Sequence, residues 1–474
     1  MADPRYSFSP LERRGVLLGL QAGQLATIGA ATAVALVLHG SVGGPGGLLL
    51  TVTVLAAGLA GAVWTRSGQP LGWWALAGIR WLCRRGGRTR LSAAPLDGHG
   101  PRAGDPACRP SRKSARSDKG GTSSGMPMGI DLIERSGRPF TGGYAVIRDR
   151  AAGSVAAVVP VNGRSLSLLD PAEQAQCLEA WRTVLAGLAR PGTPVSRLQW
   201  VQRTSTGGGA PPADLPPPAA GLPPSAAGGS ATASGSYAQL VDDVSHQVRR
   251  HDTWLVLVVG GDRRSRAPTR METLDRELRF LEGQLRQAGL EPGLPLDGGQ
   301  LRSLVRTDGM AVKEDWSALR IDRDWHATYW VAEWPRLEVG PAFLQPLLVS
   351  GSRTAVSVVM APVPTDRALR EVRSARTADL ADAALRERAG FLSSARRERE
   401  AEGVARREGE LAEGHAEYRF SGYVTVSAGS EDGLAVACSE VEHAAHAARL
   451  ELRRLYGRQA EAFTWTRPLG RGLR

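Results

Sequence analysis

Two uncharged apolar runs near the start of the chain restrict its fold more than any other feature of the sequence. The first spans residues 16–38, "VLLGLQAGQLATIGAATAVALVL", and the second spans 47–64, "GLLLTVTVLAAGLAGAVW". A helix needs roughly 20 apolar residues to cross the hydrocarbon core of a bilayer, and both runs are close to that length. The short segment between them is rich in glycine, so the runs are predicted to form a two-helix transmembrane hairpin.

Arginines flank this hairpin but are absent from the segment that joins its two runs. Arg13 and Arg14 precede the first run, and Arg66 and Arg80 follow the second. By the positive-inside rule, we expect a multi-pass protein of the cell membrane with both termini in the cytoplasm. The alternative is a cleaved signal peptide followed by one anchor. It is disfavoured because the first run exceeds the usual apolar region of about 7–15 residues and a second run follows at once.

Tryptophans and arginines alternate just beyond the second run, and they predict a helix at the membrane surface. Trp73, Trp74 and Trp81 lie among Arg80 and Arg84. Such a mixture is typical of a short amphipathic helix on the inner leaflet, here over 71–85. Residues 1–90 are therefore predicted to be the transmembrane hairpin plus this helix.

Two polar tracts divide the remaining sequence. Residues 91–124 and 205–236 are rich in proline, glycine and serine and are predicted to be linkers. They leave two blocks for folded structure, 125–204 and 237–474, which the sequence by itself assigns neither to one domain nor to two.

The first block has the pattern of a β-hairpin followed by a helix and a further strand. The runs "GGYAVIRD" and "SVAAVVPV" predict the hairpin, and "VSRLQWVQR" predicts the last strand. Between them, Asp170 is a good N-cap, Pro171 suits the first helical position and Glu173 completes a capping box. Apolar residues then recur at helical spacing, at Leu178, Trp181, Leu185 and Leu188.

The second block repeats this alternation of strands and helices. Strands are predicted at "TWLVLVVGG", "DWHATYWVAEW", "TAVSVVMAPVP" and "YRFSGYVTVSAG". Helices are predicted after a Thr269–Glu272 cap, through a charged stretch at 365–416, and over 431–456. The predicted fold class is α+β, with the N-terminal transmembrane hairpin followed by one or more α+β cytoplasmic domains.

A phosphate-binding loop is excluded by the lysines. The G-x-x-x-x-G-K-[ST] loop needs a lysine after glycine, and none of the lysines, Lys113, Lys119 and Lys313, follows one. The run "WLVLVVGGD" at 254–262 resembles the strand of a nucleotide site, but without that loop it is interpreted as a central strand.

Three short patterns are weighed as reacting groups and rejected. Residues 121–125 match G-x-S-x-G but lie in a predicted linker rather than at a strand-to-helix turn. His443 and His446 lie on one helix without an evident third metal ligand. Asp324 and His326 are explained by a polar strand edge. No catalytic, cofactor-binding or metal-binding residue is therefore predicted, and we expect no enzymatic activity.

Basic residues and cysteines add two further exclusions. The net charge of +12 comes almost entirely from arginine mixed with acidic residues, which is typical of a solvated surface. DNA binding by the arginine-rich stretch at 386–407 is an alternative, but its glutamates dilute the charge, so direct nucleic-acid binding is not expected. The scattered cysteines, Cys83, Cys108, Cys177 and Cys438, argue against a zinc site or a disulfide framework.

The order of these elements resembles that of a known family. The start "YSFSPLERRGVLLGLQAGQL" with its hairpin resembles actinobacterial membrane proteins related to PrgI, a component of conjugative type IV secretion systems. The stretches "LLDPAEQAQCLEAWRTVLAGLARPGTPVSRLQWVQRT" and "LRRLYGRQAEAFTWTRPLGRGL" are similar to the N-terminal, non-ATPase region of conjugative secretion ATPases.

The resemblance implies a structural subunit of a secretion apparatus. Such a subunit would dock a secretion ATPase in a separate chain at the cytoplasmic membrane, contact other membrane subunits and the lipid bilayer, and form a hetero-oligomer. The final segment, from Ala462, would mark the boundary at which the related ATPases begin their motor domain. Two alternatives stay open: a membrane component of a type VII secretion machine, and a membrane-tethered protein with an enzymatic activity.

Overall fold

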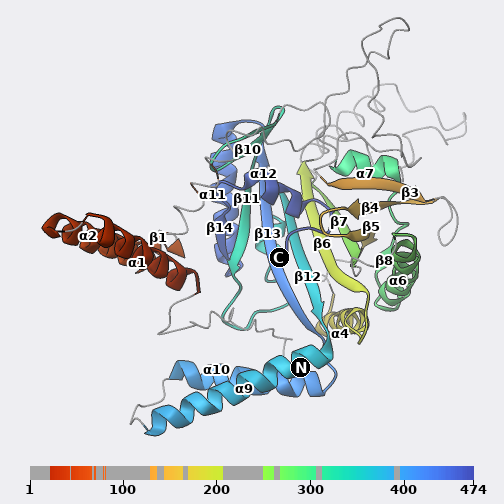
Figure 1. Cartoon of the computed structure of the whole chain (residues 1–474). Coiled ribbons are helices and arrows are strands. Elements are labelled where there is room, and N and C mark those ends of the chain that lie inside the picture. Colours follow the sequence, from red (N-terminus) through yellow and green to blue (C-terminus); the bar gives the residue numbers. More distant parts are fainter. Residues whose placement is uncertain are drawn as a thin grey trace, which may run out of the picture.

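A large antiparallel sheet forms the body of the protein. The computed structural model describes residues 22–42, 44–63, 65–66, 69–70, 78, 81, 129–135, 143–163, 169–206, 249–260, 267–305, 312–388 and 395–473. Within these residues, 12 strands form one sheet with helices on both faces (Figure 1), which confirms the α+β part of the predicted fold class. Strands from both sides of the tract at 205–236 pair directly, because β7 lies between β5 and β6.

The sheet consists of two halves with the same strand order. The first half contains β3 (Ile130–Arg135), β4 (Tyr144–Asp149), β5 (Ser154–Asn162), β6 (Val195–Thr206), β7 (Arg249–Val259) and β8 (Glu291–Pro292). The second half contains β9 (Val312–Glu314), β10 (Leu319–Ile321), β11 (Asp324–Glu333), β12 (Arg353–Val363), β13 (Glu417–Ala428) and β14 (Glu451–Arg454). The order β3-β4-β5-β7-β6 is repeated as β9-β10-β11-β13-β12, and β8 pairs with β5 as β14 pairs with β11.

An approximate two-fold axis relates the halves at the centre of the sheet. β6 and β12 join the halves as antiparallel neighbours, with Val201 opposite Ser357 midway along their pairing. The register repeats too, since Val161 lies opposite Pro292 in the first half as Val331 lies opposite Leu452 in the second. The chain therefore contains an internal structural duplication.

The helices that precede β8 and β14 end in the same way. α6 (Ala267–Gln287) and α11 (Glu431–Ala447) both close with a backbone bond from a leucine N–H, from Leu290 to Leu285 at 3.0 Å and from Leu450 to Ala445 at 2.8 Å. The residue before each leucine is left-handed: Gly289 has φ 73° and Arg449 has φ 57°. Glycine adopts this conformation at no steric cost, whereas arginine does not.

Replacing Arg449 with glycine is therefore expected to raise the free energy of unfolding by about 0.5–1 kcal/mol, because the Cβ strain of a left-handed residue outweighs the extra chain entropy of glycine. Chemical denaturation measures this difference. Arg449→Ala is the matched control, since alanine keeps the Cβ atom; equal stabilisation by both variants would mean that the gain comes from loss of the arginine side chain.

The helices cover both faces of the sheet. Side chains of α4 (Pro171–Leu188), α6, α8 (Gln345–Leu348) and α11 pack on one face in both halves. The opposite face carries α7 (Gly298–Val305), α12 (Gln459–Phe463), the 3-10 helix η3 (Thr464–Thr466) and the C-terminal segment after it.

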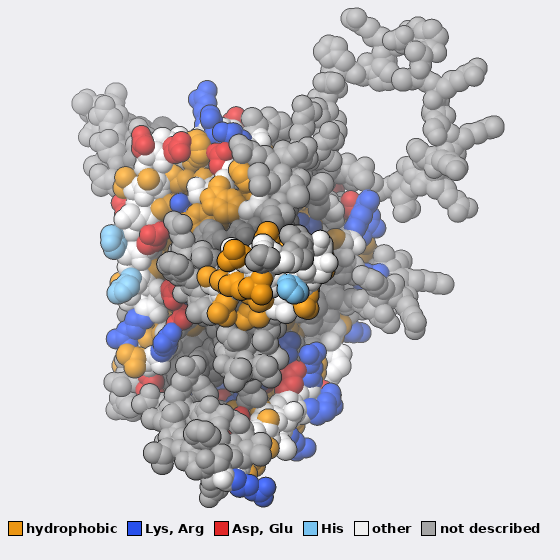
Figure 2. Space-filling view, turned by 60° about the vertical axis from the view of Figure 1, so that its left-hand side comes forward, with side chains coloured by type: hydrophobic (Ala, Val, Ile, Leu, Met, Phe, Trp, Pro, Cys, Tyr) orange, Lys and Arg blue, Asp and Glu red, His pale blue; other side chains and the backbone are white. Residues whose placement is uncertain are grey.

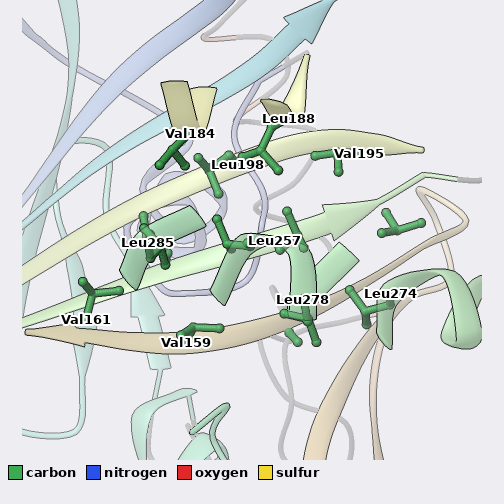
Figure 3. Close-up of a cluster of buried hydrophobic side chains, with 14 of the residues drawn as sticks. Val159, Val161, Val184, Leu188, Val195, Leu198, Leu257, Leu274, Leu278 and Leu285 are labelled. Atoms are coloured by element: carbon green, nitrogen blue, oxygen red, sulfur yellow. The ribbon is translucent and has the colours of Figure 1, made fainter. Parts of the chain in front are cut away.

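The core of the first half follows the pattern seen in the sequence. Figure 3 shows Leu274, Leu278 and Leu285 of α6 facing strand residues that include Val159 and Leu257, all of them buried. Asp170 caps α4 as predicted, and its side chain accepts the backbone N–H groups of Ala172 and Glu173. The predicted cap of α6 is wrong, because that helix begins at Ala267 and Thr269 lies inside its first turn.

The N-terminal runs form two helices that lie side by side, α1 (Ala22–Val42) and α2 (Gly44–Val63) (Figure 1). Within the residues described, however, no helix has the length and apolarity that crossing a membrane requires. The predicted transmembrane hairpin, and with it the multi-pass location in the cell membrane, is therefore wrong. Composition gives the reason: α1 includes Gln24, Thr27 and His39, α2 begins with Gly-Pro-Gly-Gly, and such residues favour insertion far less than Leu, Ile, Val or Phe.

Several other predictions fall outside the described residues. They concern residues 16–21 of the first run, the linker at 91–124, and the helix at 71–85 apart from Gly78 and Trp81. Of the linker predicted at 205–236, residues 205 and 206 instead end β6 and the rest falls outside the described residues. Beyond α2, β1 (Thr65–Arg66) and β2 (Gln69–Pro70) form a two-stranded ladder. The Trp81 ring then packs edge-on against Trp316, 5.5 Å between ring centroids, and Trp316 stacks on Tyr456. Trp81 thus contacts the second half of the body.

A pair of charged helices projects from the body between β12 and β13 (Figure 1). α9 (Thr365–Arg388) and α10 (Ala395–Ala412) correspond to the predicted helical stretch. Among their described side chains, a small apolar cluster that includes Val372, Val404 and Leu411 joins the two helices. This pair occupies the same connection in the second half that residues 207–248 occupy in the first.

Candidate functional site

The imidazole of His326, which lies two residues from Asp324 in the sequence, is a packing group. His326 is buried on β11, its Nδ1 lies 2.8 Å from the Ser427 hydroxyl, and its ring packs against Phe463 at 4.8 Å between centroids. Burial lowers the pKa of His326 to about 3, with a further contribution from the positive charge of Arg467. The carboxylate of Asp324 is bound by Arg353 at 2.9 Å. A neutral, enclosed imidazole of this kind is suited to packing rather than to proton transfer near neutral pH.

The described residues of the other rejected patterns also have structural roles. Residues 254–259 of the strand-like run belong to β7, a central strand paired on both sides, as expected. His443 and His446 are exposed on α11, and the Glu442 carboxylate beside them accepts the hydroxyl of Tyr329 at 2.8 Å. In the described part of the chain, no group of three or more metal-ligating side chains comes together. The G-x-S-x-G match at 121–125 is outside the described residues.

One buried polar cluster could not be predicted from the sequence. Cys438 of α11 accepts a hydrogen bond from Arg454 of β14, with Nη2 2.8 Å from Sγ, and the same guanidinium lies 5.3 Å from the ring of Tyr329. Burial raises the pKa of Tyr329, so its hydroxyl stays protonated. These groups come from three distant segments, and no spacing in the sequence connects them. They join α11 to β11 and β14, and we assign them that structural role.

Several charged side chains of the arginine-rich helices α9 and α10 are paired. Arg376 binds Glu408 across the two helices, Arg407 binds Glu417, and Arg419 lies 3.0 Å from Glu371. Pairing of this kind leaves little excess positive charge for phosphate contacts.

Most of the exposed large hydrophobic side chains in the described residues lie on α1 and α2. The two helices touch through small residues: Ala35 is buried, and a Cβ atom on Gly58 would lie 2.2 Å from the Cβ of Ala31. Nine of their large aliphatic side chains point outward and are 39–70% exposed. We call these the hairpin surface: Val34, Leu36, Val37, Leu48, Leu49, Leu50, Val52, Leu55 and Leu59. Figure 2, in which this side comes forward, shows the resulting apolar patch at its centre.

The hairpin surface is chemically uniform. From Ala22 to Val63 the sequence contains no Asp, Glu, Lys or Arg. Exposed apolar patches of this extent on a folded protein usually mark a contact with another molecule. The arrangement presents an apolar surface without charged side chains.

Comparison with known proteins adds no family assignment. No protein-family model matches this sequence, and no curated protein matches it significantly.

Proposed function

We propose that this chain is a non-catalytic assembly subunit of a secretion apparatus, which works with an ATPase carried by a separate chain. The observation that supports this most is the hairpin surface. In our proposal, α1 and α2 dock against apolar helices of a neighbouring subunit of the apparatus, and the body is presented to the ATPase. The resemblance of the sequence to conjugative secretion proteins supports the choice of apparatus.

The packing of α1 against α2 favours a protein partner with apolar helices. Small residues let the two backbones approach closely, so the aliphatic side chains are left on the outside. Burying apolar surface stabilises a contact by roughly 25 cal/mol per Å², whereas burying an unpaired charge there is costly. A partner that covers the uncharged hairpin surface must therefore present apolar side chains itself.

The state of the titratable groups supports a structural role. The groups best suited to chemistry, such as His326, Cys438 and Tyr329, are enclosed and hydrogen-bonded within the body. The ion pairs of α9 and α10 tie that projecting pair to the sheet through Arg407–Glu417. This arrangement suits a rigid body with a projecting arm better than it suits an enzyme.

Photo-crosslinking in the native host tests the proposal. A photoreactive amino acid at Leu49, which is 69% exposed on the hairpin surface, is expected to capture another subunit of a secretion apparatus, identified by mass spectrometry. The matched control is Val436, which is 62% exposed on α11 of the body. Co-purified ATPase sequences would then separate a type IV from a type VII apparatus.

Two results would overturn the proposal. In one, Leu49 and Val436 give the same adducts, so that the hairpin surface has no preferred partner. In the other, the Leu49 adducts contain no subunit of a secretion apparatus, even though the chain is folded and expressed at its normal level.

A further inference from the structure

A buried glutamine on the central strand contacts the backbone of the C-terminal segment. Gln199 of β6 is 0% exposed, and its Nε2 donates to the carbonyls of Trp465 at 2.9 Å and Arg467 at 3.0 Å. Its Oε1 accepts the backbone N–H of Gly470 at 2.6 Å. Nε2 also lies 2.9 Å from the hydroxyl of Ser357 on β12. A side-chain amide used this way recognises main-chain groups of the segment, since it offers both donors and an acceptor.

Two glycines of the segment lie where no side chain fits. A Cβ atom on Gly470 would lie 2.3 Å from Cγ2 of Val258, and one on Gly472 would lie 2.8 Å from the ring of Tyr423. Both residues have positive φ, 68° and 128°. The residue before them, Leu469, is 3% exposed in the apolar cluster of β7 and α7. The surroundings of the segment therefore favour leucine at position 469 and glycine at positions 470 and 472.

The arginine between the two glycines is selected by charge. Nε of Arg471 lies 2.7 Å from a carboxylate oxygen of Asp149, at the end of β4. Burial alone would raise the pKa of the Asp149 carboxyl, but the Arg471 guanidinium and the backbone N–H of Ala152 lower it overall. The Tyr423 hydroxyl donates to the carbonyl of Gly472. The contacts to the segment come from both halves of the duplicated fold.

A comparison of equivalent positions in the two halves shows that the site fits the peptide in one direction only. The segment crosses the centre of the sheet, where the C-terminus lies in Figure 1. By register, Ala355 of β12 is the residue equivalent to Gln199 of β6. Gln199 lies opposite Val256 of β7, and Ala355 lies opposite Thr425 of the equivalent strand β13. Asp149 is the last residue of β4, and the residue equivalent to it is Ile321, the last residue of β10. The second half therefore lacks both polar contacts, and only one orientation satisfies them.

We propose that this face of the sheet is a peptide-binding site for a Leu-Gly-Arg-Gly segment, and that residues 467–473 occupy it as a ligand that detaches and rebinds without unfolding of the sheet. The recognition elements are the amide of Gln199, the carboxylate of Asp149 and the two positions that admit only glycine. The same site then accepts a peptide of this sequence added in trans. This inference does not depend on the proposed secretion role.

The test uses the chain shortened to end at Thr466 and a labelled synthetic peptide of residues 467–473. We expect saturable binding by fluorescence anisotropy and a rise in the melting temperature of the shortened chain. A peptide with Arg471→Glu should bind at least about tenfold more weakly, because it places a carboxylate against Asp149, and a peptide with Gly470→Val should not bind. A folded shortened chain that binds no peptide, or binds all three equally, would overturn the proposal.

A second measurement covers the case in which the shortened chain does not fold. In the full chain, native-state hydrogen exchange should show the Gly470 amide exchanging by local opening, at least about tenfold faster than the amides of Val201 and Leu257 in the sheet. Asp149→Asn should accelerate exchange at Gly470 and leave the two strand amides unchanged. Equal protection of Gly470 and the strand amides would show that the segment is an inseparable part of the core.

Discussion

Replacing Arg190 with alanine is expected to lower the free energy of unfolding by about 3–5 kcal/mol, because it leaves a buried carboxylate without its main partner. Glu277 of α6 is 0% exposed, and Nη2 of Arg190 lies 2.6 Å from both of its carboxylate oxygens. Arg190 follows α4 and also lies over the ring of Phe280, 4.9 Å from its centroid. This one side chain therefore joins the end of α4 to α6 and neutralises a charge inside the helical layer.

Urea denaturation of two further variants separates the buried charge from the loss of an arginine. Arg286→Ala removes an exposed partner of Glu282 on the same helix and should cost about 0–1 kcal/mol. The double variant Arg190→Ala/Glu277→Leu should recover much of the lost stability, since no unpaired charge remains. The neighbouring Arg276, 3.5 Å from Glu277, offers partial compensation and places the expected loss nearer the lower bound. A single-variant cost equal to that of Arg286→Ala would contradict this account.

Replacing Gly470 with alanine is expected to lower the free energy of unfolding by about 2–5 kcal/mol, the second large effect, since two penalties add. A non-glycine residue at φ 68° is strained by about 1–2 kcal/mol, and forcing an extra carbon into a filled core costs about 1–3 kcal/mol. The new Cβ would meet Val258 at 2.3 Å, on a buried central strand that cannot move away cheaply.

Gly289 provides the control for that substitution. It has nearly the same backbone conformation, with φ 73°, but an added Cβ would meet nothing within 4 Å. Gly289→Ala should therefore cost only the backbone strain of about 1–2 kcal/mol. Denaturation midpoints of the two variants, compared at equal m-value, measure the steric difference. If both substitutions cost the same, the tight contact at Gly470 does not contribute to stability.

Local patterns in the sequence predicted most of the individual elements of the body. The stripe Leu274, Leu278, Leu281 and Leu285 is buried as its helical spacing indicates, and Asp170 caps α4. The helix expected over 431–456 ends earlier, at Ala447, because Arg449 turns left-handed and the chain continues as β14. A conformation of that kind is held by tertiary contacts, and an arginine gives no local sign of it.

Only some properties of the hairpin surface could be predicted from the sequence. The absence of charge from residue 22 to residue 63 marked the region as unusual, but length and apolarity were overestimated and led to the wrong prediction of membrane spans. That small residues lie between α1 and α2, with the aliphatic side chains outside, follows from how the two helices rotate against each other. Helical periodicity does not fix that rotation when neither helix has a charged face.

The sequence by itself determined many of the longer strands and helices of the body, where charge is absent, and that no lysine-bearing phosphate loop exists. The tertiary structure alone decided which strands are neighbours, that the sheet is a duplicated unit joined at β6 and β12, and that the final segment lies across the two-fold axis on Gln199. The physical reason is that alternation along a strand records which face is buried, whereas its partners are chosen by contacts between residues far apart in the chain.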